Sequence, residues 1–113
     1  MNDCLFCKII AGEIPSTKVY EDDSVLAFRD INPQAPVHIL VIPKTHIASI
    51  ADITPENSGV IAHISEVIAH IAREQGLNEG FRVCTNTGAH GCQSVKHLHF
   101  HLLGGRQLSE RLG

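Results

Sequence analysis

The 113-residue sequence has no long apolar run, no basic tract and no secretory start, and each absence excludes a class of protein. No apolar stretch approaches the roughly 18 residues that a membrane-spanning helix needs, so we expect no contact with a membrane. A basic start followed by an apolar stretch is missing, which predicts no signal peptide. With a net charge of −3, the chain is not expected to bind DNA or RNA.

The chain also lacks the features of disordered and multidomain proteins. Charged residues make up only 19% of the sequence and aliphatic residues are plentiful, which argues against disorder. We find no internal repeat, low-complexity tract or linker, so we predict a single domain over residues 1–113. Without an export signal we expect a cytoplasmic protein, in which the four cysteines are thiols or metal ligands rather than disulfides.

Hydrophobic patterning and turn signals predict an α+β fold, with a five-stranded antiparallel sheet, one long helix and a short N-terminal helix. The short helix is expected to end at Gly12, and the long helix, capped by Thr54, to begin at Pro55 and end at Gly76. Isoleucines at helical spacing give the long helix an apolar stripe. The short helix is predicted over residues 5–11, and the strands over 18–21, 25–29, 37–42, 81–85 and 95–103.

Histidine is the unusual residue of this sequence, with eight histidines against nine lysines and arginines. His97, His99 and His101 alternate with apolar residues in the last predicted strand. Alternate strand residues share a face about 6.7 Å apart, which predicts a row of imidazoles opposite an apolar core face. Imidazole can act as nucleophile, base or acid near neutral pH. The alternatives are an ordinary strand with polar residues outside, or a histidine pair that chelates a metal.

The segment 86–94, directly before this strand, is rich in glycine and short polar residues. Such loops let main-chain N–H groups approach a phosphate closely. The segment is not a P-loop, because no Gly-Lys-Ser or Gly-Lys-Thr follows. A surface turn is the alternative interpretation.

Residues 97–103 match at every position the His-φ-His-φ-His-φ-φ signature, with φ apolar, of the histidine triad (HIT) family, which this chain resembles over nearly its whole length. The run Leu-Gly-Gly-Arg-Gln at 103–107 is similar to the Hint branch, the purine nucleoside phosphoramidases. A HIT-like fold is therefore expected. The other segments that carry the resemblance are 6–10, 13–15, 20–23, 26–28, 30–31, 33–36, 38, 41–44, 46 and 93–95.

The resemblance implies hydrolysis of purine nucleoside 5′-phosphoramidates, such as adenylylated lysine, with release of AMP or GMP. It implies that His99 becomes a nucleotidyl-histidine and that His101 contacts the phosphate and aids proton transfer. His38 would lie near the nucleophile, and the Ser94 hydroxyl near the leaving group. The further substrate contacts that it implies are Asp30 and Ile31 at the ribose and base, Asn86, Cys92 and Gln93 on the phosphate side, and Phe28, Phe6, Leu5 and Ile9 as apolar walls.

Cys4 and Cys7 form a C-x-x-C pair near the N-terminus. In zinc-bearing members of the family, such a pair binds structural Zn²⁺ together with residues at the positions of His46 and His97. Two cysteines and two histidines are an ordinary tetrahedral zinc set. The alternative is two thiols on a short helix, with His46 on a surface turn. No Mg²⁺-type carboxylate cluster is apparent, so we expect no metal in the chemical step.

Two rival functions stay open: a hydrolase of dinucleoside polyphosphates, as in the Fhit-like branch, and a non-catalytic nucleotide- or zinc-binding regulatory module. The resemblance also implies a homodimer with a sheet continuous across the interface. The tail 108–113 has no aromatic residue where animal Hint proteins carry tryptophan, and some Hint-like sequences have glycine in place of Cys92. We expect His63 and His70 to be solvated helix residues and Cys84 to be a buried strand residue.

Overall fold

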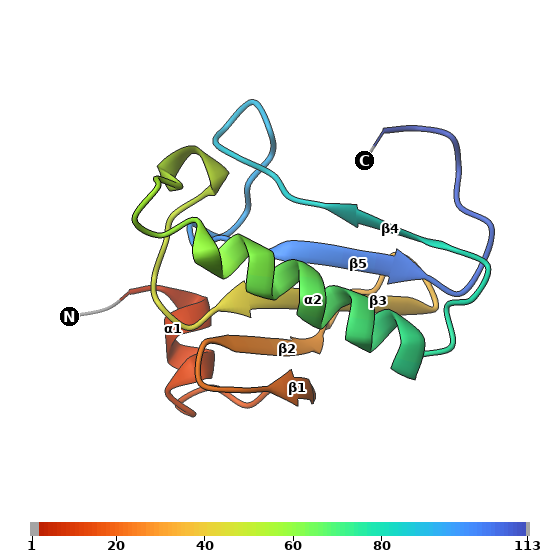
Figure 1. Cartoon of the computed structure of the whole chain (residues 1–113), viewed down its shortest axis with the longest axis horizontal. Coiled ribbons are helices and arrows are strands. Elements are labelled where there is room, and N and C mark those ends of the chain that lie inside the picture. The colour runs from red at the N-terminus through yellow and green to blue at the C-terminus, as the bar shows by residue number, and fades with distance from the viewer. Residues whose placement is uncertain (1–2, 113) are drawn as a thin grey trace.

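A five-stranded antiparallel sheet forms the centre of the molecule, in the strand order β1-β2-β3-β5-β4 (Figure 1). The computed structural model describes residues 3–112, so that Gly113 of the tail and residues 1–2 lie outside the described part. The order confirms the predicted fold class. The strands are β1 (Lys18–Glu21), β2 (Val25–Arg29), β3 (Val37–Pro43), β4 (Phe81–Cys84) and β5 (Phe100–Gly104).

The long helix α2 (Gly59–Glu74) runs across one face of the sheet (Figure 1). Its apolar stripe packs on alternate residues of the inner strands, as the periodicity predicted. Burial of one such aliphatic side chain stabilises the fold by roughly 1.5–3 kcal/mol. The buried residues of this core are Val25, Ala27, Ile39, Val41, Ile64, Val67, Ile68, Ile71, Ala72, Leu77 and Leu102.

The opposite face of the sheet is covered at one end by the short helix α1 (Leu5–Ile10). Phe6 and Ile9 of α1 are buried against side chains of β2 and β3. Cys4 caps this helix, because its sulfur accepts a hydrogen bond from the Cys7 N–H at 3.3 Å. Beyond α1, this face of the sheet carries the side chains of His38 and His101. No helix of residues 3–112 is long and apolar enough to cross a membrane.

The long helix begins four residues later than predicted, at Gly59 instead of Pro55. The Asn57 side chain accepts from the Thr54 N–H at 2.7 Å, and the Thr54 hydroxyl accepts from the Glu56 N–H at 3.2 Å. These local side-chain bonds compete with the helix and hold a separate turn. A short 3-10 helix η1 (Ile50–Asp52), which was not predicted, precedes that turn.

The last strand also begins later than predicted, at Phe100 instead of residue 95. Its final ladder pairs are Val41 with Phe100 and Cys84 with His101, so the chain before Phe100 has no strand partner. His97 and His99 therefore lie outside the strand. The predicted start of the strand is wrong, but the imidazoles still form a row: Phe6 packs edge-on against both His97 and His99, and the rings of His99 and His101 lie 5.1 Å apart. Phe100 and Leu102 pack beneath α2, as predicted.

Candidate functional site

A cavity of about 450 Å³ lies on the face of the sheet opposite α2. The register explains which strand residues reach it: Leu103 pairs with His38 and Arg82, and His101 pairs with Cys84, so these residues share one face. Residues in between, such as Leu102, face α2 instead. The cavity brings together six of the predicted site residues: His38, Asn86, Cys92, Ser94, His99 and His101.

His99 is 97% buried, and its ring is oriented by the main chain. Its Nδ1 lies 2.7 Å from the carbonyl oxygen of His97, and only an N–H can pair with a carbonyl. We therefore assign the proton to Nδ1, which leaves the lone pair on Nε2. Within residues 3–112, Nε2 has no hydrogen-bond partner. The Phe6 ring packs edge-on against the imidazole, with centroids 5.1 Å apart, and fixes its plane.

His38 and His101 form a hydrogen-bonded chain with one direction. The main-chain N–H of Gln34 donates to His38 Nδ1 at 3.0 Å, so the proton of His38 lies on Nε2. His38 Nε2 then donates to His101 Nδ1 at 2.9 Å, which leaves His101 with an Nε2–H. His101 is therefore a neutral hydrogen-bond donor toward the cavity that it lines.

Burial keeps this pair of imidazoles uncharged. It lowers the pKa of His38, against the opposing effect of Asp30. Burial, helped by repulsion from His99 and His38, lowers the pKa of His101 to about 4. At neutral pH both rings are thus available as hydrogen-bonding groups rather than as cations.

Asp30 supports the histidines from behind instead of lining the cavity. One carboxylate oxygen lies 3.4 Å from His38 Nε2, and the other accepts from the Asn32 N–H at 2.8 Å. Ile31, the other predicted nucleoside contact, is fully exposed. The predicted apolar walls Phe6, Ile9 and Phe28 are buried in the core cluster. Leu5 is 43% exposed and lines a neighbouring hollow that shares Ser94 with the cavity.

The loop 86–94 is held by its own side chains. Gln93 accepts from the Gly88 N–H and donates to the carbonyls of Ala48 and Val95, so its amide is used within the protein. Asn86 donates to the Gly91 carbonyl. Ser94 makes no hydrogen bond within residues 3–112. Its hydroxyl and main-chain N–H therefore remain for a ligand in the cavity that Ser94 lines.

Cys92 is exposed and has a φ of +62°, in the left-handed region that favours glycine. This conformation gives a physical reason for the glycine found here in some Hint-like sequences. Cys84, predicted as a buried strand residue, is only half-buried and lines the cavity.

Cys4, Cys7, His46 and His97 form a compact group, with their ligand atoms all within 4.8 Å of one another. His97 Nδ1 lies 3.3 Å from the Cys4 sulfur and 3.5 Å from the Cys7 sulfur, and His46 Nδ1 lies 3.3 Å from the Cys7 sulfur. Ligands at ordinary Zn–S and Zn–N lengths in a tetrahedron are separated by about 3.5 Å. These residues therefore fit a zinc ion.

The ring of His97 is already oriented to bind a zinc ion through Nδ1. Its Nε2 donates to the Pro43 carbonyl at 2.8 Å, which leaves the Nδ1 lone pair toward the two sulfurs. Zinc-binding histidines commonly donate their other N–H to a carbonyl or carboxylate in this way. Burial lowers the pKa of His97, which keeps the ring neutral and able to ligate.

Asp30, His38 and His101 also place three ligand atoms within 4.8 Å of one another. Their hydrogen bonds do not suit a metal. The Gln34 N–H occupies His38 Nδ1, so the proton must stay on Nε2, the atom nearest to the other two ligands. This group is therefore arranged to share protons.

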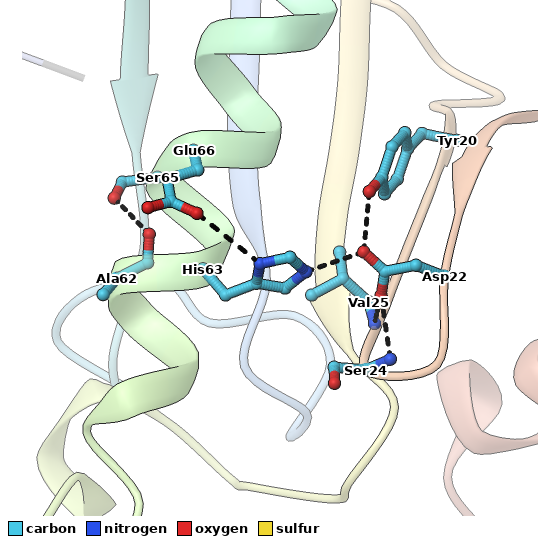
Figure 2. Close-up of polar contacts among 8 residues, drawn as sticks. All are labelled: Tyr20, Asp22, Ser24, Val25, Ala62, His63, Ser65 and Glu66. Atoms are coloured by element: carbon cyan, nitrogen blue, oxygen red, sulfur yellow. Dashed lines mark hydrogen bonds and ion pairs between the residues drawn. The ribbon is translucent and has the colours of Figure 1, made fainter.

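A third polar cluster lies on the other face of the sheet, between α2 and the turn after β1 (Figure 2). Asp22 accepts from Tyr20 at 2.7 Å and from His63 at 2.6 Å. Glu66 lies 3.8 Å from the second nitrogen of His63. The hydrogen bond to Asp22 raises the pKa of His63. The His63 side chain is 38% exposed, as expected of a solvated helix residue, and it also has a hydrogen-bond partner that the sequence did not predict.

The two arginines of the cavity, Arg82 and Arg106, were not predicted as site residues. The other lining residues outside the prediction are Gln34, Cys84, Leu103, Leu108 and Ser109. The sequence did contain a signal for Arg82, which lies between the exposed apolar residues Phe81 and Val83. Arg82 and Cys84 are alternate residues of one strand, so they share a face. Arg106 lies within the Gly-Gly-Arg-Gln run, which was used only to identify a branch of the family.

Comparisons with known proteins agree with this geometry. Residues 3–112 match the family described as scavenger mRNA decapping enzyme C-term binding. A purine nucleoside phosphoramidase of Escherichia coli is 49% identical over 111 residues, which cover 97% of this chain and 93% of that protein. A 14 kDa zinc-binding protein of Zea mays is 51% identical over 107 residues, 93% of this chain and 84% of that protein.

Among solved structures, a histidine triad protein from Clostridium difficile superposes with a TM-score of 0.95 and 55% identity, over 99% of this chain and 98% of that one. The chain belongs to the histidine triad (HIT) family, as its motif predicted. Its close homologues are Hint-like and support a hydrolase activity.

Proposed function

We propose that the protein is a purine nucleoside phosphoramidase that cleaves the P–N bond of nucleoside 5′-phosphoramidates through a covalent intermediate on His99. The tautomer of His99 carries this proposal. Its Nδ1–H is committed to the His97 carbonyl, so Nε2 offers a lone pair in a cavity that also contains Ser94 and His101. A neutral imidazole with one nitrogen anchored is a competent nucleophile toward phosphorus.

The reaction follows in two displacements. His99 Nε2 bonds to the α-phosphorus and the P–N bond breaks, while the Ser94 hydroxyl gives its proton to the departing amine. A water oxygen then bonds to phosphorus and the P–Nε2 bond breaks, which returns the electron pair to Nε2 and leaves His99 neutral. The proton lost by this water passes to the Ser94 oxygen and restores its hydroxyl, and the nucleoside monophosphate is released.

Hydrogen-bond donors stabilise the charge that develops on the phosphoryl oxygens. His101 supplies an Nε2–H, held by His38 Nε2 at 2.9 Å behind it. The Ser94 N–H is a second donor. We assign Asp30 and Ile31 to the ribose and base, where a carboxylate suits the ribose hydroxyls.

The proposal includes a structural zinc ion on Cys4, Cys7, His46 and His97. The separations of 3.3–3.5 Å between their ligand atoms support it. When bound, zinc would link α1 to the segment before β5. The reaction itself would use the histidines alone.

We also propose a cytosolic homodimer joined at strand β4. This strand lies at the edge of the sheet, and Phe81 and Val83 are 44% and 42% exposed there. An apolar edge strand is suited to pairing with a second copy.

Turnover of an AMP phosphoramidate tests the reaction, with His99→Ala against a matched control, His90→Ala. His90 is an exposed loop residue that does not line the cavity. We expect His99→Ala to lose at least 100-fold in kcat, roughly the scale of a removed catalytic group, and His90→Ala to keep wild-type turnover. When the wild-type reaction is stopped without acid, which would hydrolyse a P–N bond, mass spectrometry should show a nucleotidyl adduct on His99.

The same assay separates the rival functions. Equal rates for wild type and His99→Ala would refute the nucleophile. Faster cleavage of a dinucleoside polyphosphate than of the phosphoramidate would favour the polyphosphate hydrolase. Nucleotide binding without turnover of either substrate would favour the regulatory module.

A further inference from the structure

We propose that Arg82 and Arg106 bind an anionic group on the departing amine, so that the preferred substrates are nucleoside phosphoramidates of carboxylate-bearing amines. This inference rests on the proposed phosphoramidase activity and specifies its substrate class. Both arginines line the cavity that contains His99 and Ser94.

The position of Arg82 separates it from the expected nucleoside contacts. Arg82 lies on β4, at one edge of the sheet, whereas Asp30 follows β2 on the other side of the central strands β3 and β5. In the cavity wall, Arg82 is two residues along β4 from Cys84, the ladder partner of His101. A substrate with its phosphorus at His99 and its ribose at Asp30 would therefore direct its leaving group toward β4.

Both guanidinium groups are held by main-chain oxygens and not by acids. Arg82 donates to the Ser109 carbonyl, and Arg106 donates to the carbonyls of Gln34 at 3.0 Å and Gln107 at 3.1 Å. Among residues 3–112, neither arginine has a carboxylate within 4.0 Å. Each guanidinium has five N–H groups, so donors remain for a ligand.

The charge balance of the cavity calls for a second anion. Its lining contains two arginines and no aspartate or glutamate. The phosphoryl group of a phosphoramidate carries about one negative charge, and Ser94 and His101 already supply neutral donors to it. A carboxylate on the leaving amine would satisfy the remaining cation, and arginine binds carboxylates through paired N–H groups.

A matched pair of substrates tests this directly: AMP linked through nitrogen to glycine, and AMP linked in the same way to glycinamide. The two differ only in replacement of the carboxylate by a neutral amide. We expect wild type to favour the glycine compound by at least 10-fold in kcat/KM, the scale of one charge-assisted hydrogen bond. Because the contact is electrostatic, this ratio should fall as salt is raised.

The variants are Arg82→Gln and Arg106→Gln, with Arg82→Lys to keep the charge and Arg73→Gln as the control. Arg73 is an exposed residue in the last turn of α2. We expect the ratio of the two substrates to move toward one in Arg82→Gln and Arg106→Gln. It should be partly kept in Arg82→Lys, and it should equal the wild-type ratio in Arg73→Gln.

Three results would overturn the inference, and each has a different meaning. Equal cleavage of both compounds by wild type would remove the leaving-group preference and leave the phosphoramidase intact. An equal loss on both compounds in the glutamine variants would place the arginines on the phosphoryl group itself. Cleavage of neither compound by wild type would refute the phosphoramidase proposal, and this inference with it.

Discussion

Main-chain hydrogen bonds give the buried histidines different chemistry, although they stand close together in the sequence. The carbonyl of Pro43 accepts from His97 Nε2, which leaves Nδ1 for the metal cluster. The carbonyl of His97 accepts from His99 Nδ1, which leaves Nε2 for the cavity. The two rings are thus opposite tautomers. A spacing of two residues predicted that they would share a face, but not which nitrogen each would offer.

Outside the site, the hydrogen bond between His63 and Asp22 makes a residue-scale prediction about pH. The pKa of His63 is raised in the folded protein, so the pair contributes fully below about pH 6.5, the unfolded value, and loses this contribution as the pH rises through the folded pKa. The pKa of Asp22 is lowered, so its contribution is lost when the pH falls below about 4.

We expect the stability difference between wild type and His63→Gln to be larger at pH 5.5 than at pH 9, measured as urea midpoints. His70→Gln is the control, because His70 is an exposed residue of the same helix that packs edge-on against the Tyr20 ring and makes no hydrogen bond or ion pair within residues 3–112. A difference for His63→Gln that does not change with pH would show that the ion pair contributes nothing.

At the scale of elements, the stability of helix α1 depends on its contacts with the rest of the protein. A six-residue helix is far too short to be stable alone in water, so its position must come from tertiary contacts. Phe6 and Ile9 supply the apolar contacts, and Cys4 and Cys7 bring it within 3.5 Å of His97. Since the His97 carbonyl also holds His99, the group of Cys4, Cys7, His46 and His97 connects α1 with the proposed nucleophile.

Removal of the proposed metal should therefore loosen this end of the molecule. We expect reduced protein, purified without added zinc, to contain about one zinc per chain, and a strong chelator to lower its Tm. A ligand at 1,000 times its Kd adds about 4 kcal/mol, which corresponds to a shift of roughly 10 °C or more.

Cys7→Ser should abolish both the bound zinc and the effect of the chelator. Cys92→Ser, in the exposed loop, should keep them. An empty site in the reduced wild-type protein would contradict the zinc proposal.

The elements that could be predicted are those fixed by local patterns. The strands β1, β2 and β3 follow from alternating or continuous apolar residues between turn signals, and α2 follows from its isoleucine stripe. The starting residues of α2 and β5 could not be predicted, whereas the close of α2 at Gly76 was. The first depends on the side-chain bonds of Asn57, and the second on where the neighbouring strands stop pairing at Val41 and Cys84.

The sequence likewise predicted only part of the candidate site. The family motif indicated the triad and the metal ligands, and the structure gathers them into two adjacent groups. The arginines were missed because they come from β4 and from the segment after β5, which only the tertiary fold brings to one cavity. Gln93, which was predicted to contact substrate, bonds through its amide to the protein main chain, and its contact with substrate stays a prediction.

At the scale of the whole molecule, the sheet has one apolar edge. Strand β4 presents Phe81 and Val83 beyond the cover of α2, while Arg82 and Cys84 face the cavity. A second copy that pairs along this edge would bury those side chains and leave the cavity face open.

We expect Val83→Glu to convert a wild-type dimer to a monomer in sedimentation equilibrium, because a buried unpaired charge is costly at such an interface. Ile50→Glu is the control, since Ile50 is 40% exposed in η1, away from β4. A wild-type protein that sediments as a monomer, or a Val83→Glu protein that remains dimeric, would exclude this edge as the interface.

The groups that orient His38 and His97 belong to the main chain of Gln34 and Pro43. Alanine scanning at these two positions would leave both orienting bonds in place, because the substitution removes a side chain and keeps the peptide N–H or carbonyl. Any effect of such a variant would therefore report the lost side chain, the buried Pro43 ring or the Gln34 amide, and not the orientation of the imidazoles. An amide-to-ester replacement at residue 34, which deletes the N–H alone, would expose a dependence that ordinary mutagenesis hides.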